Sequence, residues 1–180
     1  NLYEFFQIAI GDFRETCYTK EMKITILCVG KIKEKFYTDA VSEYMKRLSR
    51  YGKPEVIEVA DEKTPDRASE VQVEQIKKKE ADRLLDRMKP DAYTITLEIQ
   101  GKKMDSVAFA GLLEKAAVEG KGHIQFVIGG SLGLHESVSE RADFKLSFSD
   151  MTFPHQLMRV ILCEQIYRGF RISNKEPYHK

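Results

Sequence analysis

Residues 124–159, IQFVIGGSLGLHESVSERADFKLSFSDMTFPHQLMR, decide the fold because they hold two strands, a glycine-rich loop and the start of a helix. Ile124–Ile128 is a short apolar run, typical of a strand buried on both faces, and it ends at the pair Gly129-Gly130. A second strand, Phe144–Phe148, leads through a polar turn to Pro154, which suits the first turn of a helix. Loops that follow parallel strands meet at one edge of a sheet, so we expect a ligand there.

The rest of the chain alternates in the same way between strand and helix patterns. Strands are expected at 23–29, 55–59 and 92–99, the last of them breaking at Gln100-Gly101. Helices are expected at 36–51, within 61–89, and at 106–118, 134–142 and 154–170. Asp105 is the expected N-cap of its helix, and the many charges within 61–89 are interpreted as a solvated helix face. The pattern predicts an α/β fold with a mostly parallel sheet flanked by helices.

Length and composition place the chain among ordinary globular proteins. Of its 180 residues, 42% are hydrophobic and 32% are charged, which argues against disorder. No apolar run approaches the roughly 20 residues that span a bilayer, and no secretory signal is recognisable, so we expect a cytoplasmic protein without membrane contact. Residues 1–21 lack a regular pattern and are interpreted as an N-terminal extension, non-native or disordered, ahead of one domain at 22–180.

Cysteine and histidine spacings predict neither disulfides nor a metal site. The three cysteines, Cys17, Cys28 and Cys163, are odd in number and far apart, and are interpreted as buried or idle thiols. The four histidines show no metal-binding spacing. From Pro154 onward, five basic residues stand against two acidic ones. This surplus of positive charge predicts either binding of a polyanion or, equally, a favourable interaction of the basic side chains with the C-terminal end of the helix dipole.

Several residues of the opening stretch have both a functional and a structural interpretation. Gly129–Gly133 is neither a triphosphate-binding nor a dinucleotide-binding motif, and is either a ligand loop or a tight turn. Asp150 is either a base or a local hydrogen-bond acceptor in its turn. By spacing alone, His155, Arg159 and Arg168 are surface residues of the last helix.

Five segments, taken together, resemble the bacterial large-subunit (23S) ribosomal RNA pseudouridine N3-methyltransferases, a branch of the trefoil-knot (SPOUT) methyltransferases. They are KITILCVGKIKEKF at 23–36, LEIQGK at 97–102, FVIGGSLGL at 126–134, LSFSDMTFPHQLMRVILCEQIYRGFRI at 146–172 and PYHK at 177–180. The resemblance covers 22–180 and implies a C-terminal trefoil knot, an exception to the usual avoidance of threading.

The resemblance also implies S-adenosyl-L-methionine as the cofactor, held by three loops. The residues carried over for this role are Leu97, Gly129, Phe148, Ser149, Asp150, Met151, Thr152 and Phe153. An apolar slot for adenine would be formed by Leu97, Ile128, Met151 and Phe153 together with glycine backbone.

The implied substrate is a pseudouridine in 23S ribosomal RNA within the assembled ribosome. Our hypothesis is that Arg168, Tyr178 and His179 bind and polarise the base, while His155 and Arg159 organise the floor of the site. The resemblance further implies a homodimer that packs through the last helix, with Leu157, Ile161 and Ile166 half in the core and half in the interface.

Two functions of other classes remain open at this point. One is a catalytically silent ribosome-binding or assembly factor with the same fold, which need not bind a methyl donor. The other is a generic α/β nucleotide-binding domain, which predicts affinity for ATP or NAD instead.

Overall fold

The computed structural model describes residues 22–178, so the segment 1–21 and the expected site residue His179 lie outside the described residues. The strands are β1 (Lys23–Val29), β2 (Lys53–Val59), β3 (Tyr93–Lys103), β4 (His123–Ile128) and β5 (Phe144–Ser147). The helices are α2 (Lys35–Leu48), α3 (Glu70–Arg87), α4 (Ser106–Val118), α5 (Glu136–Ser139) and α6 (His155–Ser173). Within 22–178, no helix combines the length and apolarity needed to cross a membrane.

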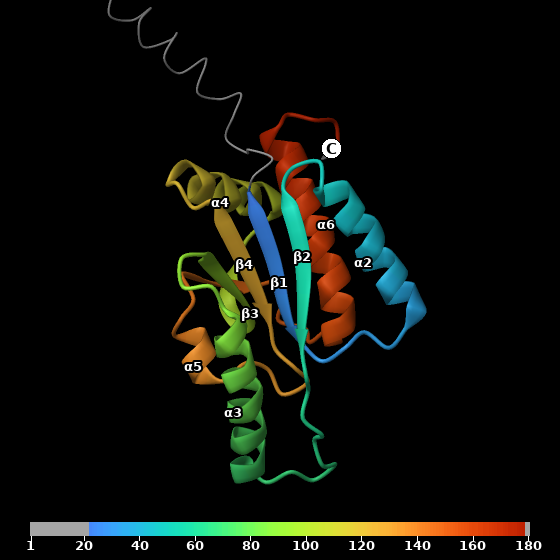
Figure 1. Cartoon of the computed structure of the whole chain (residues 1–180), viewed down its shortest axis with the longest axis vertical. Helices are drawn as coiled ribbons and strands as arrows, with labels where there is room; N and C mark the ends of the chain where they lie inside the picture. The colour runs from blue at the N-terminus through green and yellow to red at the C-terminus, as the bar shows by residue number, and fades with distance from the viewer. Residues whose placement is uncertain (1–21, 179–180) are drawn as a thin grey trace, which may run out of the picture.

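The five strands form one parallel sheet in the order β2-β1-β4-β3-β5 (Figure 1). This confirms the predicted α/β class and the parallel sheet. Parallel pairing brings the carboxyl ends of all five strands to one edge, and β4, β3 and β5 are neighbours there. The trefoil knot stays a prediction of the resemblance.

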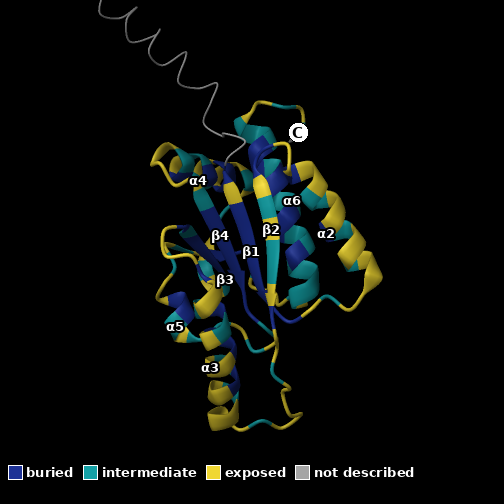
Figure 2. Cartoon of the chain, in the orientation of Figure 1, coloured by how far each residue is buried: buried dark blue, intermediate teal, exposed yellow. Residues whose placement is uncertain are grey.

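Helices cover both faces of the sheet, as expected for strands that are apolar on both sides. On one face, Ile26, Phe126 and Ile95 pack in a core with residues of α2, α4 and α6. On the other face, Leu27 and Val127 pack with residues of α3 and α5. Figure 2 shows the central strands β1 and β4 largely buried, whereas the edge strand β2 is mostly intermediate or exposed and the outer helix surfaces are exposed.

Helix ends and thiols largely follow the sequence predictions. Asp105 caps α4 by accepting a hydrogen bond from the backbone N–H of Ala108 at 2.7 Å. Cys28 and Cys163 are completely buried, and burial raises the pKa of each thiol to about 12. The prediction of buried thiols is therefore confirmed for these two cysteines.

The expected break of β3 at Gln100-Gly101 is wrong. The strand runs on to Lys103, with a register shift between Leu97 and Lys102. A Cβ at Gly101 would lie 2.6 Å from the carbonyl carbon of Leu146, so glycine here allows close approach to β5 and does not end the strand.

Three helices also differ in extent from the expectation, and the one expected at 36–51 ends at Leu48, with Ser49 as its C-cap. The helix expected at 134–142 shrinks to Glu136–Ser139, because His135 is its N-cap and the chain turns directly into β5. The last helix extends three residues past Phe170, through Arg171 to Ser173. The side chain of Asn174 donates to the carbonyl of Phe170 at 2.7 Å and helps to close that end.

Candidate active site

Three loops that the sequence marks as cofactor-binding leave adjacent strands. Leu97 on β3 pairs with Ile128 at the end of β4 and with Leu146 on β5. The glycine loop and the segment 148–153 therefore both begin beside Leu97. Leu97 itself lies at the register shift inside β3, and not at the end of its strand as predicted.

The glycine loop folds back on itself so closely that no side chain fits at Gly129. The backbone N–H of Gly133 donates to the carbonyl of Gly130 at 3.1 Å, and Gly133 adopts a left-handed conformation with φ near 80°. A Cβ at Gly129 would lie 2.7 Å from the carbonyl carbon of Gly133. Glycine at 129 is thus required by the fold of the loop itself, and the exposed backbone of Gly133 is the part of the loop that is open to its surroundings.

The segment 148–153 is held by its own hydrogen bonds and by the end of β3. The hydroxyl of Ser149 accepts from the backbone N–H of Met151 at 3.0 Å. Asp150 forms an ion pair with Lys103, so the structure places its carboxylate on a cation of the neighbouring strand. Met151 is 72% exposed, unusual for so apolar a side chain.

These features fit the methyl donor that the resemblance implies. Adenine requires an apolar slot with backbone donors and acceptors, and a flexible amino-acid tail requires polar groups near the surface. The apolar side chains that could form the slot are half-buried, namely Leu97, Phe148 and Phe153. The polar side chains are half-buried at Ser149 and exposed at Asp150 and Thr152. Together with the side-chain-free backbone at Gly129, they supply both kinds of surface at one sheet edge.

Arg159 is buried, which overturns its interpretation as a surface residue. Its side chain is completely inaccessible. The guanidinium donates to Glu58 at 2.6 Å, to the carbonyl of Val29 at 2.9 Å and to the carbonyl of Gly30 at 2.7 Å. Arg159 therefore joins the first turn of α6 to the ends of β1 and β2, next to the donor loops.

His155 lies at the same edge, one turn before Arg159. A Cβ at Gly30 would be 3.6 Å from both the ring Nε2 of His155 and the side chain of Asp61. Burial, and then the positive charge of Arg159, lower the pKa of His155 below its ordinary value of 6.5. The ring is therefore neutral at physiological pH.

The lowered pKa of His155 predicts a loss of stability in acid. The unfolded chain takes up a proton at His155 at a higher pH than the folded chain does, so this contribution to folding is present above pH 6.5 and is lost as the pH falls below it. We expect the wild type to lose more unfolding free energy between about pH 7 and about pH 5 than His155→Gln. Urea titrations at both pH values measure this, and equal losses would contradict it.

Arg168 and Tyr178 lie together, but not with His155 and Arg159. The guanidinium carbon of Arg168 is 4.7 Å from the ring centre of Tyr178, and the same guanidinium pairs with Glu164 at 2.7 Å. His155 and Arg168 are separated by 13 residues of α6, about 20 Å along the axis. Within one chain the predicted catalytic residues therefore form two groups at opposite ends of α6.

Other residues at the edge were not predicted from sequence. Glu58 and Asp61 have no motif around them, and Glu80 was counted with the solvated charges of its helix. Glu80 is in fact 5% exposed, on the side of α3 that packs toward the glycine loop. One sequence feature could have predicted its burial. Glu80 is four residues from both Ile76 and Leu84, so it lies on the apolar stripe of α3.

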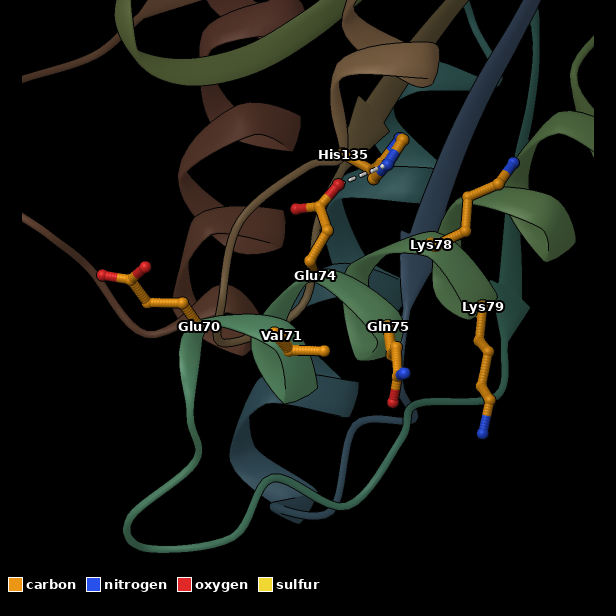
Figure 3. Close-up of a pocket in the computed structure, with 7 residues that line it drawn as sticks. All are labelled: Glu70, Val71, Glu74, Gln75, Lys78, Lys79 and His135. Atoms are coloured by element: carbon orange, nitrogen blue, oxygen red, sulfur yellow. Dashed lines mark ion pairs between the residues drawn. The ribbon is translucent and has the colours of Figure 1, made fainter.

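A separate hollow of about 650 Å³ lies on α3, and Figure 3 shows the residues that line it. His135 contributes its ring, which pairs with Glu74 at 2.8 Å, and the other lining residues all come from α3. A hollow formed by one helix surface does not enclose a ligand. We therefore place the candidate site at the strand ends and not here. Within 22–178 no cluster of side chains is arranged to hold a metal ion.

Solved structures similar to this chain show its fold. A probable methylase family protein from Haemophilus influenzae Rd KW20 is 14% identical, with a TM-score of 0.50 over 90% of this chain and 72% of that one. A probable methyltransferase from Bordetella pertussis Tohama I is 11% identical, with a TM-score of 0.50 over 88% of this chain and 98% of that one. At these identities the likeness extends to the fold alone.

Sequence relatives are much closer. The ribosomal RNA large subunit methyltransferase H of Clostridium beijerinckii is 55% identical over 159 residues, which are 88% of this chain and 100% of that protein. A Methanococcus maripaludis protein that bears the same name provisionally is 60% identical with the same coverage. A family model described as "Predicted SPOUT methyltransferase" matches residues 22–179. The resemblance read from the sequence is thereby confirmed, and the chain belongs to the SPOUT methyltransferase family.

Proposed function

We propose that this protein transfers the methyl group of S-adenosyl-L-methionine to N3 of a pseudouridine in 23S ribosomal RNA of the assembled ribosome, in the cytoplasm. The observation that carries the proposal is that the glycine loop after β4, Leu97 of β3 and the segment 148–153 after β5 lie side by side at one edge of the sheet. Relatives that match over their whole length bear the name of a large-subunit ribosomal RNA methyltransferase, which supports this class of substrate.

The donor end of the site needs this chain's residues for binding and orientation. When bound, S-adenosyl-L-methionine supplies an electrophilic methyl group on a positively charged sulfonium. Leu97, Ile128 and Phe153 would line the adenine slot, and the backbone at Gly129 would permit close approach. His155 and Arg159 hold the first turn of α6 to the sheet and so keep the floor of the site in place.

The RNA end of the site needs a second copy of the chain. Arg168 lies too far along α6 to reach the donor loops of its own chain, and Tyr178 packs beside it, so we propose a homodimer in which both approach the partner's loops. Leu157 and Ile161 are half-exposed on α6 and suit such an interface. Ile166 is only 1% exposed, so its expected share in the interface is wrong and it belongs to the core.

The target nitrogen carries a weakly acidic proton that leaves as the methyl group arrives. A guanidinium beside the base would stabilise the resulting N3 anion, and an aromatic ring would stack on the base. Arg168 and Tyr178 supply this pair of groups, with His179 next in the chain. Arg168 pairs with Glu164 in the free chain, so RNA would replace that carboxylate as its partner.

The experiment that tests this function is tritiated methyl transfer to intact ribosomes, compared with free ribosomal RNA. We expect label in N3-methylpseudouridine from ribosomes and much less from free RNA. Calorimetry with S-adenosyl-L-methionine accompanies it. A protein that binds ribosomes but no donor would be the silent assembly factor, and one that binds ATP or NAD instead would be a generic nucleotide-binding domain.

Arg168→Ala and His179→Ala are expected to reduce methyl transfer to ribosomes by about tenfold or more, because each removes a polar contact to the target nucleotide. Donor affinity should change little, since the donor loops are untouched. Single-turnover rates and calorimetry measure the two effects separately. Arg87→Ala, an exposed arginine at the end of α3, is the control. Full activity in both variants would remove these residues from the mechanism.

A further inference from the structure

Glu80 is a buried carboxylate in a helix whose other acidic residues are solvated. It is 5% exposed, and one carboxylate oxygen accepts a hydrogen bond from the backbone N–H of Glu62 at 3.0 Å. Arg83, on the next turn of α3, forms its ion pair with Glu62. Arg83 is thus paired with Glu62, although its charge also lowers the pKa of Glu80, by less than burial raises it.

The carboxylate of Glu80 lies directly behind the glycine loop. A Cβ at Gly130 would be 2.9 Å from one oxygen of Glu80, 3.2 Å from the other, and 3.1 Å from a methyl carbon of Val29. Any side chain at Gly130 would displace this carboxylate. Glu80 thus lies against the glycine loop from the side of α3.

Burying a negative charge in this way is costly for the free protein. Desolvation is the main reason that the pKa of Glu80 is raised, and the hydrogen bond from Glu62 offsets only part of that effect. A buried carboxylate is normally retained where a cation compensates it. The residues around Gly130 point to a cation that arrives with the ligand.

We propose that Glu80 is the counter-charge for the donor's sulfonium, so that the glycine loop binds the positively charged donor in preference to its neutral demethylated product. The inference rests on the proposed function, because it requires the donor at this loop. Methyl transfer converts the sulfonium to a neutral thioether and so removes the attraction. Product would then leave more readily than substrate.

Glu80→Gln tests this with two ligands that differ in charge. The amide keeps an acceptor for the N–H of Glu62 and nearly the same shape, but carries no charge. We expect affinity for S-adenosyl-L-methionine to fall about tenfold and affinity for S-adenosyl-L-homocysteine to change less than about twofold, both by calorimetry. Glu70→Gln is the matched control: it removes an exposed carboxylate from the first turn of the same helix, away from Gly130, and should leave the ratio of the two affinities unchanged.

The outcomes separate this inference from the proposed function. Equal weakening of both ligands, or no weakening of either, would show that Glu80 only supports the loop and would overturn the inference. Failure of the wild type to bind either ligand would overturn the proposed function instead. Glu80→Met, an uncharged side chain of similar length, provides a second neutral variant if the glutamine disturbs folding, and thermal unfolding of each variant checks this.

Discussion

A Gly129→Ala protein is expected to bind S-adenosyl-L-methionine at least about a hundredfold more weakly than the wild type. The added methyl group would lie 2.7 Å from the carbonyl carbon of Gly133 and 2.9 Å from both its oxygen and the nitrogen of Leu134. All three are backbone atoms, which cannot rotate away as the end of a side chain can. The loop would have to open, and the surface offered to the donor would change shape.

Gly111→Ala is the matched control for that experiment. Gly111 is exposed on α4, and a Cβ there meets nothing within 4 Å. Alanine should leave donor affinity unchanged and stabilise the helix by up to about 1 kcal/mol. Calorimetry and thermal unfolding of both variants check the pair. Wild-type donor affinity in Gly129→Ala would mean that the donor does not bind at the glycine loop.

Arg159→Ala is expected to lower the free energy of unfolding by about 3–5 kcal/mol, a large share of the stability of a domain of this size. The substitution removes a completely buried guanidinium together with three hydrogen bonds. The carbonyls of Val29 and Gly30 lose a hydrogen-bond donor, and the carboxylate of Glu58 loses the cation that it pairs with. A cavity adds to the loss.

Arg47→Ala is the control for Arg159→Ala. Arg47 pairs with Glu43 one turn away on α2, and their side chains are 43% and 53% exposed. An exposed pair of this kind contributes little to stability, because solvent screens it. Urea unfolding of the two variants measures the difference. If Arg159→Ala unfolded at the same urea concentration as Arg47→Ala, the buried network would not stabilise the fold.

The sheet and the three loops could be predicted because their signals are local. An apolar run ending in Gly129-Gly130 marks a buried strand and a tight loop without knowledge of any neighbour. Parallel pairing then brings the ends of β4 and β5 to the same edge as Leu97. The assignment of these residues to the methyl donor came from the family resemblance and stays a prediction for calorimetry to test.

The burial of Arg159 and Glu80 could not be predicted, because it depends on contacts far along the chain. Arg159 bonds to Glu58 and Gly30, more than a hundred residues away, and helical spacing carries no information about them. Glu80 lies against Gly130, again a distant partner. Charged side chains are usually solvated, so a rule based on composition fails where a buried charge is held by hydrogen bonds.

At Gly101 a local sequence pattern led to a wrong prediction, the end of β3. Glycine after a strand commonly marks a turn, and this gave the expected break in β3. The same absence of a side chain also lets two backbones approach, and the proximity of β5 selects that second use. The outcome depends on a strand more than forty residues later, so nothing near Gly101 distinguishes the two.

The strand order has a consequence for how the molecule assembles during synthesis. β3 is synthesised before β4. In the sheet, however, β3 pairs only with β4 and β5, and not with β1 or β2. A growing chain that has emerged only as far as α4 therefore has a paired β1 and β2 and a third strand with no partner. Insertion of β4 between β1 and β3 completes the sheet late, and such pairing between distant segments is slow. Fragments that stop before His123 should thus be prone to association through the unpaired strand. The edge proposed to bind the donor forms only when the final third of the polypeptide has been made.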